Sequence, residues 1–267
     1  MPPVILSIAG YDPSSGAGVT ADVKTAAANG CYAATCITAL TVQSTEGVFA
    51  VQAVSADLIR RTLKALADDL EIAAVHLGML GSDETAYVVA DFLGSLHLPN
   101  IVLDPVIRSS SGAALLDEAG LEVMRTRFIP LCNAMTPNIH EAAILTGAEP
   151  LSETTAWEAA LPRIREMAEN LHKLGSRAVV ITGGHLDPPN DYLSSMVPLQ
   201  ELIIDGKRVE SRSTHGTGCA YATALACYLA LGEGLPQAAR QAKEYVSRAI
   251  RAAYPIGKGI GPLNHFP

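Results

Sequence analysis

The stretch VILSIAGYDPSSGAGVTADVKTAAANGCYAATCITALT, residues 4–41, decides the fold class. It begins with the apolar run Val4–Ala9, which is typical of a buried strand, and passes through a glycine-rich segment into a helical pattern at Thr20–Asn29. A second strand candidate, Tyr32–Thr41, follows at once. This order of strand, helix and strand predicts a mainly parallel sheet with helices packed on its faces.

The same alternation continues to the C-terminus. Further strands are expected at Ala74–Leu77, Ile101–Leu103, Ala134–Thr136 and Ala178–Thr182. Further helices are expected at Ala56–Asp69, Asp83–Ser95, Glu118–Phe128, His140–Thr146, Ala156–Leu174, Cys219–Leu231 and Leu235–Tyr254. Segment Asp187–Ser195 is expected to be a surface loop that leads to a hairpin around Asp205-Gly206. We therefore expect one α/β domain, residues 1–267, built as a three-layer α/β/α sandwich with a mainly parallel central sheet.

Composition limits the possible partners and the cellular compartment. The 267 residues are 49% hydrophobic and carry a net charge of -8, so a nucleic acid or an anionic membrane is not expected as the main partner. The N-terminus has no basic region of the kind that starts a signal peptide. Five cysteines without a C-x-x-C pair are typical of reduced thiols, which predicts a cytoplasmic protein without a disulfide framework.

Five polar or glycine-rich segments follow the predicted strands directly. They are Gly10–Gly18, Gly78–Gly81, Asp104–Gly112, Thr136–Glu141 and Gly183–His185. In an open parallel sheet the carboxyl ends of the strands share one edge, where ligands bind. We therefore expect most of these segments to line one crevice, the alternative being that some are ordinary turns.

The segment STHGTGCA, residues 213–220, leads straight into a helix of small and apolar residues. Gly216, Thr217 and Gly218 can turn successive backbone N–H groups toward one point, and the helix N-terminus adds partial positive charge. Such a site suits the charge on a phosphoryl group in transfer. Cys219, in the first helical turn, is positioned where a thiolate is stabilised and could accept a proton from a hydroxyl. The alternative is a capped helix start with an inert cysteine.

Other motifs exclude some activities and leave others open. Residues 16–21 match the pattern G-x-G-x-x-A, but no acidic residue ends the next strand, so dinucleotide binding is disfavoured. There is no Walker A motif and no G-x-S-x-G elbow, which disfavours a P-loop enzyme or an α/β-hydrolase. Asp22 either binds substrate or serves as a favourable charge at the helix start. His76, His97, His172 and His185 lack ligand spacing and are interpreted as structural or surface residues.

Three oxygen-bearing residues are candidates for a metal site. Asp104 ends the run NIVLD, and Asn138 and Glu141 lie in TPNIHEA. Oxygen ligands suit Mg²⁺ that is held partly by phosphates and water. The alternatives are a loop cap for Asp104 and a first-turn helix charge for Glu141.

Taken together, the chain resembles the hydroxymethylpyrimidine/phosphomethylpyrimidine kinases of thiamine biosynthesis, which belong to the ribokinase-like superfamily. The matching stretches cover nearly the whole chain: IAGYDPSSGAGVTADVKT, ITALTVQSTEGV, HLGML, VLDPV, TPNIHEAAILTG, ITGGH, THGTGCA and GKGIGPLNHF. The resemblance implies a ribokinase-like fold, the cofactors ATP and Mg²⁺, a small pyrimidine substrate and a homodimer.

The resemblance also implies roles for individual residues. Cys219 corresponds to the catalytic base, and Gly216, Thr217 and Gly218 to an anion hole. Gln43 corresponds to the residue that hydrogen-bonds the pyrimidine. The remaining residues are implied in the substrate pocket (Ala17, Asp22, Met79, Val106), beside the nucleotide (Asn138, Thr182, Gly184) and at the metal (Asp104, Glu141).

The chain departs from the family pattern at three places. The family usually has Ala-Lys-Ser-Gly where this chain has Ser109–Gly112, with Arg108 nearby. Thr182 stands where a lysine is usual before Gly-Gly-His, and the first loop has Tyr11 and Ser15 where small residues are common. Because the two replaced lysines would lie near phosphates, these differences bear most on a second phosphorylation.

Three functions are compared on this basis. The first is a kinase for 4-amino-5-hydroxymethyl-2-methylpyrimidine and its monophosphate. The second is a pyridoxal/pyridoxine kinase on the same fold, because that substrate also carries a hydroxymethyl group on an aromatic heterocycle. The third, of another class, is a non-catalytic pyrimidine-binding relative, which the replaced lysines suggest and the intact GTGC segment opposes.

Overall fold

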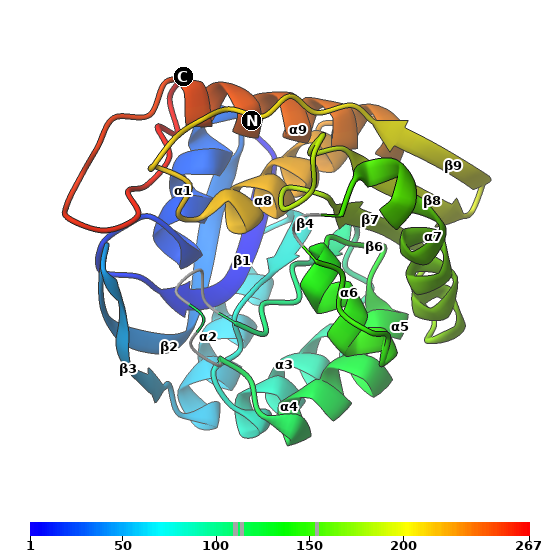
Figure 1. The fold of residues 1–267 in the computed structure, drawn as a ribbon. Coiled ribbons are helices and arrows are strands. Elements are labelled where there is room, and N and C mark those ends of the chain that lie inside the picture. Colours follow the sequence, from blue (N-terminus) through cyan, green and yellow to red (C-terminus); the bar gives the residue numbers. More distant parts are fainter. Residues whose placement is uncertain (109–111, 113–114, 153–154) are drawn as a thin grey trace.

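A single mixed sheet with helices on both faces organises the chain (Figure 1). The structure is a computed structural model that describes residues 1–108, 112, 115–152 and 155–267. In these residues the strand order is β3-β2-β1-β4-β5-β6-β7-β8-β9. The neighbouring strands β2, β1, β4, β5, β6 and β7 pair in parallel. The pairings β2–β3, β7–β8 and β8–β9, at the two ends of the sheet, are antiparallel. Their bounds are β1 Val4–Tyr11, β2 Tyr32–Ser44, β3 Gly47–Ala53, β4 Ile72–Leu77, β5 Ile101–Leu103, β6 Ala134–Met135, β7 Ala178–Thr182, β8 Asp191–Met196 and β9 Leu199–Ile204.

Two unequal helix layers cover the sheet and confirm the predicted three-layer class. The first layer contains α1 (Gly18–Ala28), α8 (Thr217–Ala230) and α9 (Leu235–Arg251), and its core is rich in alanine. The second contains α2 (Ala56–Asp69), α3 (Asp83–Ser95), α4 (Glu118–Val123), the π-helical segment Met124–Phe128, α5 (Ile129–Leu131), α6 (Ile139–Thr146) and α7 (Trp157–Lys173). Its core contains the larger Leu, Ile, Met and Phe side chains. Small side chains let the first layer approach the sheet closely.

The C-terminal sheet edge differs from the prediction. The expected hairpin around Asp205-Gly206 is wrong, because the chain turns at Val197-Pro198 between β8 and β9. The expected surface loop is wrong from Asp191 onward, since Tyr192 and Leu193 are buried in β8. The Pro-Pro-Asn run just before β8 gives a turn signal that hides this short polar strand.

Two other elements also went unpredicted. Strand β3 pairs antiparallel with β2, but its exposed face gives little apolar alternation to detect. The helix predicted at Glu118–Phe128 becomes π-helical from Met124 and ends in α5 at Leu131. No helix in the described ranges is both long and apolar enough to cross a membrane.

The loop after β1 and the start of α8 are in intimate contact. Gly216 has φ 84°, and a Cβ added there would lie 1.8 Å from the carbonyl oxygen of Gly16. Only glycine accommodates both the left-handed backbone and this approach. Two segments that are about 200 residues apart in sequence are thus joined at the carboxyl edge of the sheet.

Candidate active site

One large cleft lies at the carboxyl ends of the parallel strands. It encloses about 790 Å³, and all five segments expected to meet there contribute to its wall. Their lining residues include Gly10 and Ala17, Met79, Asp104 and Val106, Asn138 and Glu141, and Gly184 and His185. The predicted convergence of strand ends is therefore confirmed.

The N-terminus of α8 opens into this cleft. Gly216 is the N-cap residue and provides no side-chain hydrogen bond, so no capping side chain satisfies the amides of the first turn. Thr217, Gly218 and Cys219 line the cleft, and Gly218 is exposed. The N–H of Thr217 reaches the carbonyl of Thr214 only at 3.4 Å, and amides at a helix N-terminus can bind an anion such as a phosphoryl group.

The thiol of Cys219 is reachable but strongly biased toward its protonated form. Its side chain is partly exposed and lines the cleft. Burial of the sulfur, followed by the carboxylates of Asp104 and Asp22, raises the pKa of Cys219 well above its usual value. This direction is opposite to the expected stabilisation of a thiolate at the helix start, because desolvation and two negative neighbours favour the protonated thiol.

Asn138 and Glu141 cap α6 while facing the cleft. Oδ1 of Asn138 accepts the backbone N–H groups of His140 and Glu141 at 2.9 Å, and Oε2 of Glu141 accepts the N–H of Asn138 at 2.9 Å. This reciprocal pair is a capping box. Glu141 therefore has the helix-start position that sequence reasoning gave as its alternative, and it also borders the cleft.

The carboxyl groups of Asp104 and Glu141 both border the cleft, and the charge of Asp104 disfavours the ionisation of Glu141. Burial, followed by the charge of Asp22, raises the pKa of Asp104 to about 6, and burial together with the Asp104 charge raises the pKa of Glu141 to about 8. A divalent cation between them would relieve this repulsion. Among the described residues no group of three or more His, Cys, Asp or Glu could hold a metal, so phosphates and water would have to complete the coordination of such an ion.

Gln43 lies beside a hydrogen-bonded pair that the motif search did not single out. Its side-chain amide is 3.1 Å from Nε2 of His215, and that nitrogen is 2.8 Å from Oδ2 of Asp12. All three side chains line the cleft. Their sequence signals were Asp12 in the glycine-rich loop and His215 directly before Gly216, but neither position suggested that the two would pair.

Asp22 is the one predicted pocket residue that does not line the cleft. Its carboxylate is fully buried behind the wall, where it accepts hydrogen bonds from Ser7 at 2.6 Å and Thr223 at 2.8 Å. His76 approaches the same carboxylate at 3.1 Å. Asp22 therefore does not contact a substrate in the cleft directly, and that part of the prediction is corrected. Ala17, Met79 and Val106 do form part of the wall.

The residues predicted to lie beside the nucleotide, Asn138, Thr182 and Gly184, all line this cleft. Arg108 and Lys243 line it too, and Nζ of Lys243 lies 2.7 Å from Oδ1 of Asp191. This lysine lies in the middle of α9, far in sequence from the strand-end segments, so no sequence motif indicated that it would line the cleft. The serines at 109–111, where the family usually has a lysine, lie outside the described residues.

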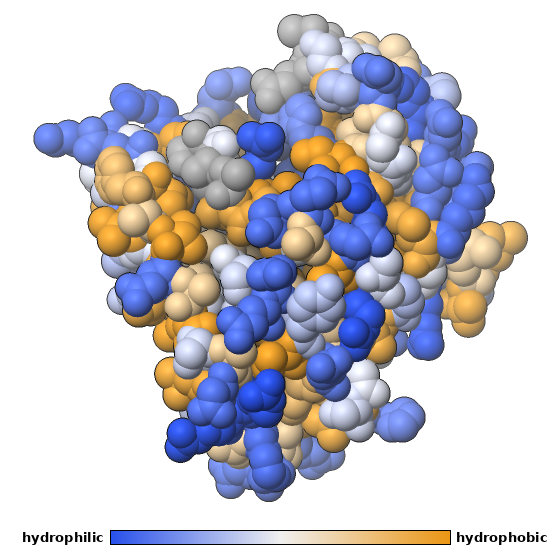
Figure 2. Space-filling view, turned by 90° about the horizontal axis from the view of Figure 1, so that it is seen from below, coloured by the Kyte–Doolittle hydropathy of each residue, from blue (hydrophilic) through white to orange (hydrophobic). Residues whose placement is uncertain are grey.

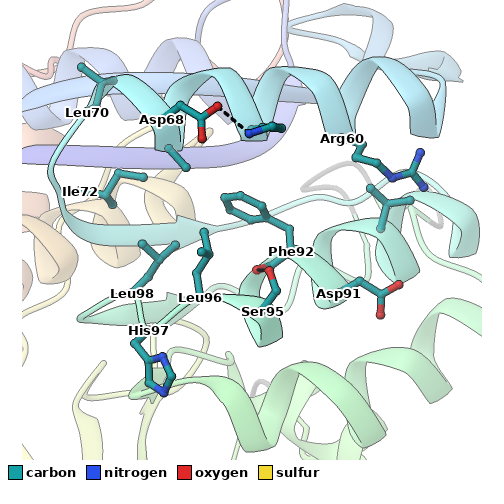
Figure 3. A pocket seen from close by; sticks show the side chains of 13 residues that line it. Arg60, Asp68, Leu70, Ile72, Asp91, Phe92, Ser95, Leu96, His97 and Leu98 are labelled. Atoms are coloured by element: carbon teal, nitrogen blue, oxygen red, sulfur yellow. Dashed lines mark hydrogen bonds and ion pairs between the residues drawn. The ribbon is translucent and has the colours of Figure 1, made fainter.

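A second hollow, of about 580 Å³, lies between α2 and α3, away from the strand ends (Figure 3). Phe92, Leu96 and Leu98 form apolar walls, and Arg60 and Asp91 lie at its rim. It contains none of the predicted site residues. The chemistry therefore belongs to the cleft at the carboxyl edge.

Comparisons with known proteins give a consistent result. The family model described as phosphomethylpyrimidine kinase matches residues 12–264. The hydroxymethylpyrimidine/phosphomethylpyrimidine kinase of Streptomyces coelicolor is 39% identical over 99% of this chain and 94% of its own length. The thiamine biosynthesis bifunctional protein ThiED of Geobacter sulfurreducens is also 39% identical, but this chain spans only 52% of that protein. Among solved structures, an ADP complex of Bacillus subtilis pyridoxal kinase has a TM-score of 0.88 at 29% identity and covers 99% of this chain and 98% of its own.

Proposed function

Because the chain belongs to the phosphomethylpyrimidine kinase family, we propose that it transfers the γ-phosphoryl group of ATP to 4-amino-5-hydroxymethyl-2-methylpyrimidine. The product monophosphate then accepts a second phosphoryl group, and the whole span 1–267 acts as one kinase domain in the cytoplasm. The observation that carries this proposal is the meeting of five strand-end segments around Cys219 and the open amides of α8.

The cleft supplies the elements that phosphoryl transfer requires. The hydroxymethyl oxygen attacks the γ-phosphorus, the bond from that phosphorus to the bridging oxygen of ADP breaks, and the hydroxyl proton passes to Sγ of Cys219 in its thiolate form. The amides of Gly216, Thr217 and Gly218 stabilise the charge on the migrating group. The high pKa of Cys219 makes the thiolate scarce at neutral pH but a strong base once formed.

The substrate and the nucleotide would occupy opposite parts of the cleft. Gln43, Met79 and Val106 line the part suited to an aromatic ring, since they offer an amide and apolar surfaces. Asn138, Thr182 and Gly184 line the part assigned to ATP. Asp104 and Glu141 fit Mg²⁺, which when bound would neutralise phosphate charge there.

A coupled assay tests the activity. We expect turnover of ATP that depends on the pyrimidine and falls about a hundredfold in Cys219→Ala, provided that the variant keeps the wild-type circular dichroism spectrum. Full turnover by a correctly folded Cys219→Ala protein would refute the role of the base. Binding of the pyrimidine without any ATP turnover would favour a non-catalytic binding protein.

The structural likeness to pyridoxal kinase makes that activity the second candidate. Both substrates place a hydroxymethyl group on a flat ring of similar size, so the fold alone does not separate them. The ratio of kcat/KM for the pyrimidine and for pyridoxal decides between the candidates. We expect the pyrimidine to be preferred, and a preference for pyridoxal would reject the first assignment.

The second phosphorylation depends on binding a substrate that is already charged. Arg108 lines the cleft and is the described cation nearest in sequence to the replaced family lysine. We propose that its guanidinium takes part in holding the substrate monophosphate. Arg108→Ala should then raise KM for the monophosphate more than KM for the free pyrimidine, and equal changes would contradict this role.

We also propose that the chain forms a homodimer through the exposed ribbon of β2 and β3. Leu40 and Val42 are exposed on one face of this ribbon, and Phe49 and Val51 are exposed on β3, where Val51 pairs with Thr41 on the other face. Figure 2 shows apolar surface on the side of the molecule where β2 and β3 lie in Figure 1. Sedimentation analysis should give a dimer for the wild type and a monomer for a Val42→Ser/Phe49→Ser variant; a wild-type monomer would exclude the proposal.

A further inference from the structure

The carboxylate of Asp12 accepts hydrogen bonds from five directions. Oδ1 accepts the backbone N–H of Ser14 at 2.8 Å and its hydroxyl at 2.7 Å, and Oδ2 accepts the N–H groups of Gly16 at 3.1 Å and Ala17 at 2.9 Å. Nε2 of His215 lies 2.8 Å from the same Oδ2. Burial alone would raise the pKa of Asp12, but hydrogen bonds from His215 and Ser14 outweigh it and lower that pKa.

These donors determine where the proton on His215 lies. An ionised carboxylate can only accept, so Nε2 of His215 must carry a hydrogen and donate it to Asp12. The ring packs closely against Gly16, where an added Cβ would lie 2.3 Å from its Cδ2, and the contact with Asp12 holds it there. His215 therefore presents a fixed N–H donor at this point of the cleft.

That donor in turn determines the orientation of the Gln43 amide. The end of this side chain lies 3.1 Å from Nε2 of His215, and its other end lies 3.1 Å from Oγ1 of Thr41. If the amide nitrogen faced His215, two donors would oppose each other. With the amide turned over, its oxygen accepts the Nε2 hydrogen of His215 together with Asp12, and its NH₂ group donates to Oγ1 of Thr41. The hydroxyl hydrogen of Thr41 is then donated to the carbonyl of Tyr11 at 3.0 Å. Every donor of this cluster then has an acceptor, except the second N–H of the Gln43 amide.

We propose that the Asp12–His215 pair holds the Gln43 amide with its NH₂ group available to the substrate, which makes His215 a positioning residue for pyrimidine recognition. One hydrogen of that NH₂ group bonds Thr41, and the second is free for a ring nitrogen, which is an acceptor. The inference deepens the proposed function and rests on it, because it takes Gln43 as the residue that contacts the ring.

A double-mutant cycle tests whether His215 acts through Gln43. His215→Ala should raise KM for the pyrimidine about tenfold, with a smaller fall in kcat, and should change it less than about twofold in a Gln43→Ala background. His215→Gln, which keeps an N–H donor toward Asp12, should recover part of the loss. The same fold-change in both backgrounds would mean that His215 only supports the loop, and would overturn the inference.

A near-isosteric variant tests which end of the amide faces the ring. The carboxylate of Gln43→Glu can still accept from His215 and from Thr41, but it has no N–H to offer. We expect its KM for the pyrimidine to rise about as much as in Gln43→Ala, roughly tenfold. A wild-type KM would show that the ring contact uses the oxygen, and would overturn the inference.

A measurement without turnover separates this inference from the proposed function. The ¹⁵N chemical shift of Nε2 in ligand-free wild type should be that of a protonated ring nitrogen. An unprotonated Nε2 with full turnover of the pyrimidine would refute only the positioning role. A protonated Nε2 in a protein that does not phosphorylate the pyrimidine would refute the proposed function, and the recognition role of His215 with it.

Discussion

Nδ1 of His76 lies 3.1 Å from Oδ2 of Asp22, and both side chains are fully buried beneath the cleft. Burial alone would lower the pKa of His76, but the charge and hydrogen bond of Asp22 raise it above the usual value. In the part of the chain that the structure describes, Nε2 of this ring has no hydrogen-bond partner. When it is protonated, the His76 ring lowers the pKa of Asp104, whereas the charge of Asp22 raises it, so the pair lies within electrostatic reach of the cleft.

Replacing His76 should destabilise the protein in a pH-dependent way. His76→Leu leaves the Asp22 charge uncompensated, which costs about 3–5 kcal/mol of unfolding free energy. Because the pKa of His76 is raised on folding, its stabilisation is fully present below the unfolded value of 6.5 and is lost as pH rises through the folded value. Urea unfolding should thus show the largest difference from wild type near pH 6. His97→Leu, at the second hollow, is the control, and a difference independent of pH would contradict the ion pair.

The thiol of Cys219 should react only under alkaline conditions. Its raised pKa predicts slow alkylation by iodoacetamide at pH 7, a rate that increases with pH, and protection by bound substrate. Mass spectrometry should place the label on Cys219 alone, because the other four cysteines are buried. The same titration predicts that kcat/KM rises with pH and that Cys219→Ala loses both this rise and about a hundredfold in rate. Fast alkylation at pH 6 would contradict the assignment.

Removing the charge of Glu141 should separate stability from activity. Gln at this position can still accept the N–H of Asn138, so the helix cap survives. Since the folded pKa of Glu141 is about 8 and the usual value is 4.5, wild type loses stability relative to Glu141→Gln as pH rises between them. We expect Glu141→Gln to have a higher Tm at pH 9 but a lower kcat and a weaker response to Mg²⁺. Asn138→Ala, which removes the cap and costs about 1 kcal/mol, is the comparison; a Tm below wild type at pH 9 would argue against a strained carboxylate.

A methyl group added at Gly216 should lower both stability and activity, unlike a methyl group added at an unconstrained glycine. Gly216→Ala forces a side chain into a backbone with φ 84° and against the carbonyl of Gly16. We expect a loss of at least about 1 kcal/mol in stability and a large fall in kcat. Gly94→Ala, in open space within α3, is the matched control and should stabilise by about 0.5–1 kcal/mol. Wild-type kinetics for Gly216→Ala would show that the two loops can separate freely.

Regular periodicity made the centre of the sheet predictable, because a buried parallel strand is a short apolar run. Ile101–Leu103 and Ala178–Thr182 have the predicted bounds, as do α2 and α3, whose starts are marked by a capping serine. The edges were missed since β3 is exposed and β8 is buried through small polar residues, so neither shows a clear pattern. Tertiary context alone decides such strands.

The site was predictable where chemistry follows from position along the chain. Residues at strand ends and at the start of α8 could be placed at one edge, and the structure brings the predicted site residues among them to the cleft. Asp22, within α1, is the predicted residue that stays behind the wall. The pairing of Asp12 with His215 and the charge state of Cys219 could not be read from the sequence. Both depend on burial and on neighbours more than 100 residues away in the chain.

The alanine-rich packing of α8 against the sheet, α1 and α9 makes the cleft sensitive to substitutions well outside it. Ala222, Ala224 and Ala226 are completely buried along the helix whose first turn holds the proposed anion site. A valine or leucine at any of these positions would overpack the core and displace α8, and its first turn would move with it. Substitutions of these alanines should therefore give proteins that fold normally but turn over slowly. A search for distant substitutions that lower activity should begin at these positions.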